Sequence, residues 1–84
     1  MQITFKLYAG LTDYLPVAHR IGNQMSLDVA ADATIDRIVE PFHMPPRLVH
    51  IVLVNGVFVP PEERATRTLV EGDVLAIWPP VAGG

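Results

Sequence analysis

The chain has 84 residues, no cysteine and a formal net charge of −3, and half of its residues are hydrophobic. A chain of this length forms one domain with little interior volume, so we do not expect a self-contained enzyme with a deep substrate pocket. The composition argues against a disordered chain, a disulfide framework, a membrane span and a basic surface for nucleic acid. The lack of cysteine, together with Lys6 interrupting the apolar N-terminal segment, predicts no export signal and a cytoplasmic location.

Two segments near the N-terminus, residues 2–8 and 25–29, alternate polar and apolar side chains. This period of two is typical of strands with one face on a core. A turn-prone stretch, residues 10–23, separates the two strands. The side chains expected to point inward are Ile3, Phe5, Leu7, Met25, Leu27 and Val29.

The apolar spacing changes to that of a helix after Asp32. Thr34 is placed to accept backbone N–H groups as the N-cap, and Asp36 lies near the positive end of the helix dipole. Pro41 lacks an N–H group, so the helix should end near Glu40 after about two turns. The side chains on its core face are Ile35, Ile38, Val39 and Phe42.

Asn55 and Gly56 separate two β-branched, apolar segments, residues 50–54 and 57–59. An Asn-Gly pair in this context predicts a two-residue type I′ hairpin. The turn fixes the register, so Leu53 and Phe58 should lie opposite each other on the face away from the core. The valines assigned to the core face are Val52, Val54, Val57 and Val59.

Prolines at positions 60 and 61 end the fourth strand, and a charged loop follows. A Glu-Gly-Asp turn at residues 71–73 leads into the last strand, residues 74–78, with Leu75 and Ile77 inward. The charged side chains of the loop are Glu62, Glu63, Arg64 and Arg67. The element order predicts an α+β fold, in which one helix crosses one sheet.

The face of the sheet away from the helix is unusually apolar. Alternation places Tyr8, Leu53, Phe58 and Trp78 there, where a half-exposed sheet ordinarily carries Thr, Lys and Glu. We interpret this face as a partner-binding surface. A misplaced covering loop or a self-dimer remains the alternative.

Candidate catalytic and metal-binding groups are few. The histidines His19, His43 and His50 are scattered, with no ligand spacing, so no metal site is expected. Glu62 and Glu63 are adjacent in the charged loop, which predicts a solvated turn rather than an acid–base pair. The sequence therefore supplies no catalytic side chain.

The C-terminal segment, residues 79–84, follows two prolines and ends in Gly83 and Gly84. We expect a flexible tail on a single domain that comprises residues 1–84. Small termini are commonly disordered without any function. A narrow diglycine end is nevertheless the shape required to thread a carboxylate into another protein's active site, because glycine allows close approach of the backbone.

The chain resembles the ubiquitin-like sulfur carriers of the MoaD and ThiS group along its whole length. The residues that carry this resemblance are the Asn55-Gly56 turn between hydrophobic strands, the Leu-Val-Glu-Gly-Asp segment at 69–73, and the Trp-Pro-Pro-Val-Ala-Gly-Gly ending at 78–84. The length and the ending are more similar to the small subunit of molybdopterin synthase than to the shorter thiamine carriers. The resemblance implies a β-grasp fold with a mixed sheet.

The resemblance also implies a carrier cycle without a bound cofactor. A partner related to the ubiquitin-activating enzymes would use ATP to adenylate the carboxylate of Gly84, with Gly83 giving access. A sulfurtransferase would then convert it to a thiocarboxylate, and an acceptor such as the large subunit of molybdopterin synthase would take the sulfur. The implied partner-binding residues are Tyr8, Leu53, Phe58, Trp78, Pro80, Val81 and Ala82.

Three functions therefore remain open from the sequence. The first is a sulfur carrier, most similar to those of molybdenum cofactor or thiamine synthesis, which is a co-substrate and not an enzyme. The second is a ubiquitin-like modifier joined to protein lysines through Gly84. The third is an interaction module whose tail has no role.

Overall fold

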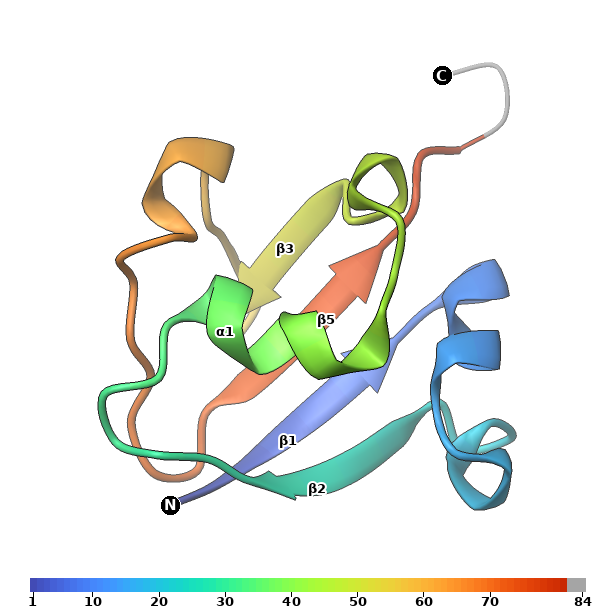
Figure 1. The fold of residues 1–84 in the computed structure, drawn as a ribbon. Coiled ribbons are helices and arrows are strands. Elements are labelled where there is room, and N and C mark those ends of the chain that lie inside the picture. The colour runs from blue at the N-terminus through green and yellow to red at the C-terminus, as the bar shows by residue number, and fades with distance from the viewer. Residues whose placement is uncertain (82–84) are drawn as a thin grey trace.

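A computed structural model describes residues 1–81 and contains one five-stranded sheet in the order β2-β1-β5-β3-β4. Strand β5 is parallel to β1 and antiparallel to β3, so the sheet is mixed. Helix α1 packs across one face of the sheet (Figure 1), which confirms the expected α+β architecture. The elements are β1 (Gln2–Leu7), β2 (Gln24–Asp28), α1 (Ile35–Val39), β3 (Ile51–Val54), β4 (Val57–Phe58) and β5 (Val74–Trp78).

The core lies between the sheet and α1. Strand β1 alternates buried and partly exposed residues, as its sequence predicts, with Phe5 and Leu7 fully buried. From the helical side, Ile35 and Ile38 are buried, and the Phe42 ring lies 4.6 Å from the Phe5 ring, centroid to centroid. The inward assignments of Ile3, Leu75 and Ile77 are confirmed, whereas Met25, Leu27 and Val29 of the β2 segment are only half-buried.

Helix α1 begins and ends where the sequence predicts. The Thr34 side-chain oxygen accepts a hydrogen bond from the Arg37 backbone N–H at 3.3 Å. The α-helix ends at Val39, and Pro41 lies in a 3-10 turn, η3 (Glu40–Phe42). Because proline cannot donate to the preceding turn, this tightening of the backbone is its expected effect.

The stretch between β1 and β2 is more ordered than the predicted turn. It forms two 3-10 helices, η1 (Ala9–Tyr14) and η2 (Val17–His19). Leu11 and Leu15 are each only 1% exposed and join the hydrophobic core. This segment therefore closes one end of the core, a role that the sequence analysis missed.

The β3–β4 hairpin has the predicted turn and register. Asn55 and Gly56 have φ angles of 51° and 81°, and Leu53 pairs with Phe58. One assignment was wrong, because Val57 is 68% exposed although it pairs with the buried Val54. Strand β4 has only two residues at the sheet edge, so the core does not extend far enough to cover its first side chain.

The side chain of Asn55 connects this turn to the start of β5. Its Nδ2 donates to Asp73 Oδ1 at 2.8 Å, and its Oδ1 accepts from the Val74 backbone N–H at 2.8 Å. The other carboxylate oxygen of Asp73, which is largely buried, accepts from the Val70 backbone N–H at 2.9 Å. The two turns are thus held in a fixed relation at one end of the sheet.

We predict that Gly56→Val lowers the free energy of unfolding by about 1–2 kcal/mol through left-handed backbone strain. A Cβ on Gly56 would meet nothing within 4 Å, so the loss would be conformational and not steric. Chemical denaturation measures it. Gly22→Val is the matched control, since Gly22 is also in open space without a positive φ. If both variants lost the same free energy of unfolding, backbone strain at Gly56 would not be the cause.

Candidate functional site

Tyr8 and Trp78 form an aromatic pair on the face of the sheet opposite α1. Their rings are stacked, with centroids 4.0 Å apart and planes 5° from parallel. The Tyr8 backbone N–H donates to the carbonyl of Ile77 at 3.1 Å, which fixes Tyr8 beside the end of β5. Parallel pairing of β1 with β5 brings these residues together from opposite ends of the chain.

Leu53 and Phe58 extend this apolar face toward the β4 edge. They are cross-strand partners, and Phe58 is 51% exposed while Trp78 is 39% exposed. Ile51 pairs with Trp78 and lies two residues before Leu53, so it joins the two halves of the face. We call Tyr8, Ile51, Leu53, Phe58 and Trp78 the outer patch. Ile51 was not among the residues predicted for this face, although strand alternation could have placed it there.

A small side chain lies at the centre of this face. Ala76 lies between Lys6 of β1 and Leu53 of β3 in the sheet register, and its small side chain is almost completely buried. The small side chain of Ala76 is therefore flanked on both sides by larger ones. Such a surface offers apolar area to a complementary partner and no catalytic group.

Arg64 does not project from a solvated loop, as the sequence analysis assumed. Its side chain is 6% exposed, and its three nitrogens Nε, Nη1 and Nη2 donate to the carbonyls of Val59, Val49 and His50 at 3.1, 3.2 and 3.1 Å. Burial lowers the pKa of Arg64, partly opposed by the carboxylates of Asp36 and Glu62. These bonds fasten the 60–64 segment to the start of β3.

The Arg64 guanidinium also contacts the outer patch. Its central carbon lies 5.9 Å from the centroid of the Phe58 ring, within the range of a cation–π interaction. Phe58 is thereby held at the edge of the sheet although half of its surface remains exposed. The exposed Phe58 ring is thus positioned by a side chain that is itself held by three hydrogen bonds.

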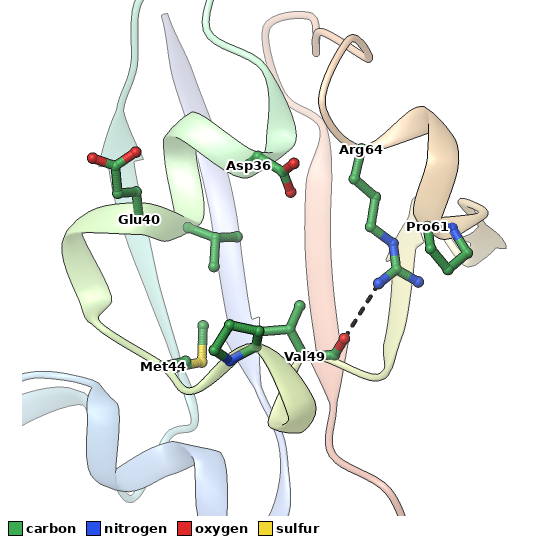
Figure 2. A pocket seen from close by; sticks show the side chains of 8 residues that line it. Asp36, Glu40, Met44, Val49, Pro61 and Arg64 are labelled. Atoms are coloured by element: carbon green, nitrogen blue, oxygen red, sulfur yellow. Dashed lines mark hydrogen bonds between the residues drawn. The ribbon is translucent and has the colours of Figure 1, made fainter.

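A cavity of about 360 Å³ lies between α1 and the segment that precedes β3. Figure 2 shows Asp36 and Glu40 projecting from the helical side, with Arg64 extended on the other. The guanidinium is committed to backbone carbonyls, and no nucleophilic side chain lines the cavity. Glu62 and Glu63 are exposed in the neighbouring turn. The cavity has no arrangement for acid–base or nucleophilic chemistry.

The C-terminal segment begins directly at the outer patch. Trp78 is the last residue of β5 and is followed by a half-buried Pro79, an exposed Pro80 and Val81, which is 70% exposed. The remaining candidate residues, Ala82, Gly83 and Gly84, lie outside the described residues. The segment thus leaves the sheet from its middle strand, beside the stacked aromatic pair.

Residues 1–81 contain no group of three or more His, Asp or Glu side chains that could hold a metal ion. Within the same residues, no helix has the length and hydrophobicity to span a membrane.

A family model described as Mut7-C ubiquitin matches residues 1–83. The chain belongs to the Mut7-C ubiquitin family. Among curated proteins, none matches the sequence significantly.

Solved structures from Haloferax volcanii and Helicobacter pylori are similar to this Mut7-C ubiquitin family member. SAMP1 from Haloferax volcanii is 25% identical, with a TM-score of 0.70 and complete coverage of both chains. Small archaeal modifier protein 1 of H. volcanii is 22% identical, with a TM-score of 0.66 and coverage of 95% of this chain and 98% of that one.

A third similar structure is a chain in the complex of subunits 1 and 2 of molybdopterin-converting factor from Helicobacter pylori. It is 16% identical, with a TM-score of 0.62 and complete coverage of both chains. Together with the family model, these matches confirm the ubiquitin-like β-grasp fold of the family member. SAMP1 and the chain from the molybdopterin-converting factor complex share this fold.

We predict that Phe58→Ala and Trp78→Ala each lower the free energy of unfolding by less than about 1.5 kcal/mol, because each ring forms one specific contact at the surface. Phe5→Ala is the control, since it removes a fully buried ring and should cost about 3–5 kcal/mol. Thermal and chemical denaturation compare the three variants. Losses at Phe58 or Trp78 as large as that at Phe5 would show that the outer patch belongs to the core.

Proposed function

We propose that this protein is a sulfur carrier whose working group is the C-terminal carboxylate of Gly84. The observation that carries the proposal is the place where the C-terminal segment begins, since Pro79 follows the last residue of the middle strand directly beside the outer patch. A partner that docks on this patch has the tail within immediate reach. The ubiquitin-like fold and the diglycine ending support the same proposal.

The proposed chemistry takes place in partner active sites. An adenylating enzyme related to the ubiquitin-activating enzymes joins the Gly84 carboxylate to the α-phosphate of ATP and releases pyrophosphate. A sulfide equivalent from a sulfurtransferase then attacks the acyl carbon and displaces AMP, which leaves a thiocarboxylate. This activation is required because a carboxylate is a poor electrophile, whereas AMP is a good leaving group.

The acceptor that we propose is an enzyme of molybdenum cofactor synthesis, equivalent to the large subunit of molybdopterin synthase. The similar chain in a complex of two molybdopterin-converting factor subunits supports this assignment through the fold. In this scheme Pro80, Val81 and Ala82 are the residues of the tail that contact the acceptor. The protein itself acts as a co-substrate and binds no cofactor.

A second function is favoured by a specific comparison. The similarity to SAMP1 and to a protein described as a small archaeal modifier supports a modifier role, in which Gly84 forms an isopeptide bond with lysines of other proteins. Both functions begin with the same adenylation. They differ in the nucleophile that displaces AMP, which is a sulfur in one and a lysine amine in the other.

Mass spectrometry of the protein isolated from its own source separates the two functions. The sulfur carrier predicts a free chain ending at Gly84, in which sulfur replaces one carboxylate oxygen. The modifier predicts branched peptides in which the Gly83-Gly84 end is attached to lysine. A chain that continues beyond Gly84 in the cell would contradict both.

We predict that one residue added after Gly84 abolishes adenylation, because the reacting carboxylate is displaced from the partner's active site. The melting temperature should not change, since the last residue of the described core cluster is Ile77, seven positions before Gly84. Gly84→Val should be nearly as damaging because of its branched side chain. Pyrophosphate release by the activating enzyme measures the effect, and full activity of the extended protein would contradict the assignment.

We also predict that Phe58→Ala and Trp78→Ala weaken binding to the activating enzyme by about thirtyfold or more, as truncation of a central aromatic often costs 2 kcal/mol. Val70→Ala is the matched control, because Val70 is an exposed apolar residue outside the outer patch. Isothermal titration calorimetry compares the affinities. Equal affinity of all three variants would exclude the outer patch as the docking surface.

A further inference from the structure

The two edges of the sheet differ in how they are protected. Strand β4, at one edge, has only two residues and is followed by Pro60 and Pro61. Short edge strands and prolines prevent further strand pairing. Strand β2, at the other edge, is five residues long and has no proline, no lysine and one charged side chain, Asp28. No other segment of the described chain lies beside its outer side in Figure 1.

The unpaired backbone groups of β2 belong to alternate residues. Leu7 donates to the Asn23 carbonyl at 3.1 Å and Val29 donates to the Met1 carbonyl at 2.8 Å, so the odd-numbered residues of this segment bond to β1. In an antiparallel ladder the residues between them point their N–H and C=O groups the other way. These residues are Gln24, Ser26 and Asp28, whose side chains are also exposed.

We propose that this edge pairs with the β2 edge of a second copy of the chain around a twofold axis at Ser26. In the antiparallel register centred there, Gln24 lies opposite Asp28 of the other copy, and Ser26 lies opposite itself. All three outward-pointing residues then form hydrogen-bonded pairs. The result is a continuous ten-stranded sheet made from two five-stranded ones.

In this register, the side chains of β2 are compatible with those of β2 in the second copy. On the outer face, the Gln24 amide can donate to the Asp28 carboxylate, so two like charges never lie opposite each other. Asp28 Oδ1 already lies 3.2 Å from the N-terminal nitrogen of its own chain, which reduces its negative field. In a twofold interface the same surface meets itself, so its charges must complement each other. Strand β2 meets this requirement, which favours a second copy of the chain as the partner over an unrelated strand.

The helix-facing side of the same edge is apolar. Met25 and Leu27 are half-buried and would pair across the twofold axis, Met25 of one copy opposite Leu27 of the other. A groove of about 310 Å³ adjoins this edge, between β2 and the helical segment, and is lined in part by Leu27, Ile38 and Phe42. Pairing would remove this apolar surface from water on both copies.

The proposed dimer is independent of the carrier function and compatible with it. Strand β1 separates β2 from β5, so Trp78 and the start of the C-terminal segment at Pro79 lie away from the paired edge. Each copy could therefore engage its own partner. One assembly would carry two tails.

Sedimentation velocity at protein concentrations up to about 1 mM tests the proposal, since a dissociation constant in that range is weak but detectable. The expected result is a concentration-dependent species of twice the 9.2 kDa chain mass. Ser26→Pro should abolish it, because proline removes an N–H group that points to the partner and not to β1. Ser26→Ala is the control that retains this N–H and should remain dimeric.

Charge variants test the twofold register directly. Ser26→Glu and Ser26→Lys each place two like charges opposite each other, so each variant alone should be monomeric. An equimolar mixture places Glu opposite Lys and should restore the dimer. Circular dichroism verifies that every variant is folded.

Three results would overturn the proposal. The first is a wild-type protein that remains monomeric at every concentration. The second is a charge-variant mixture that fails to dimerise although both variants are folded. The third is a dimer that Phe58→Ala disrupts but Ser26→Pro does not, which would place the contact on the outer patch.

Discussion

The position of β5 is the constraint on which the rest of this structure depends. It is the middle strand of the sheet, with β1 parallel on one side and β3 antiparallel on the other. Without it, the β1–β2 and β3–β4 pairs have no common hydrogen-bonded neighbour. The network of Asn55 and Asp73 sets where β5 begins, and the burial of Leu75 and Ile77 holds it against the helical layer.

The same strand connects the core to the candidate site. Its inward side chains are buried, while Trp78 at its end stacks on Tyr8 and precedes the C-terminal segment. A middle strand is hydrogen-bonded on both sides, so its end frays less easily than the end of an edge strand. The C-terminal segment therefore begins at a well-anchored residue. Its starting point is therefore fixed relative to the outer patch, as the proposed docking of a partner on that patch requires.

Most of the fold could be predicted from local patterns, because alternation and the Asn55-Gly56 turn depend on neighbouring residues. Leu11 was missed because a 3-10 helix is too short to show a clear apolar period. The burial of Arg64 could not be predicted, since its carbonyl partners come together only after the hairpin has formed. Val57 was placed wrongly because strand alternation predicts which face of the sheet a side chain is on, but not how far the core extends over that face. For the site, strand alternation correctly placed Trp78 on the face away from the helix. Its contact with Tyr8 could not be predicted in this way, because it depends on β1 and β5 being neighbours in the sheet.

The pairing of β1 with β5 also determines when the molecule can assemble during synthesis. These neighbours lie at opposite ends of the described chain, so almost the whole sequence must leave the ribosome before they can meet. The two hairpin-like halves can form earlier, but the sheet closes only when residues 74–78 insert between them. Products truncated before residue 74 consequently lack the strand that joins the two halves of the sheet. The topology thereby couples closure of the sheet to the synthesis of its last strand, so an incomplete chain exposes the apolar faces of both halves.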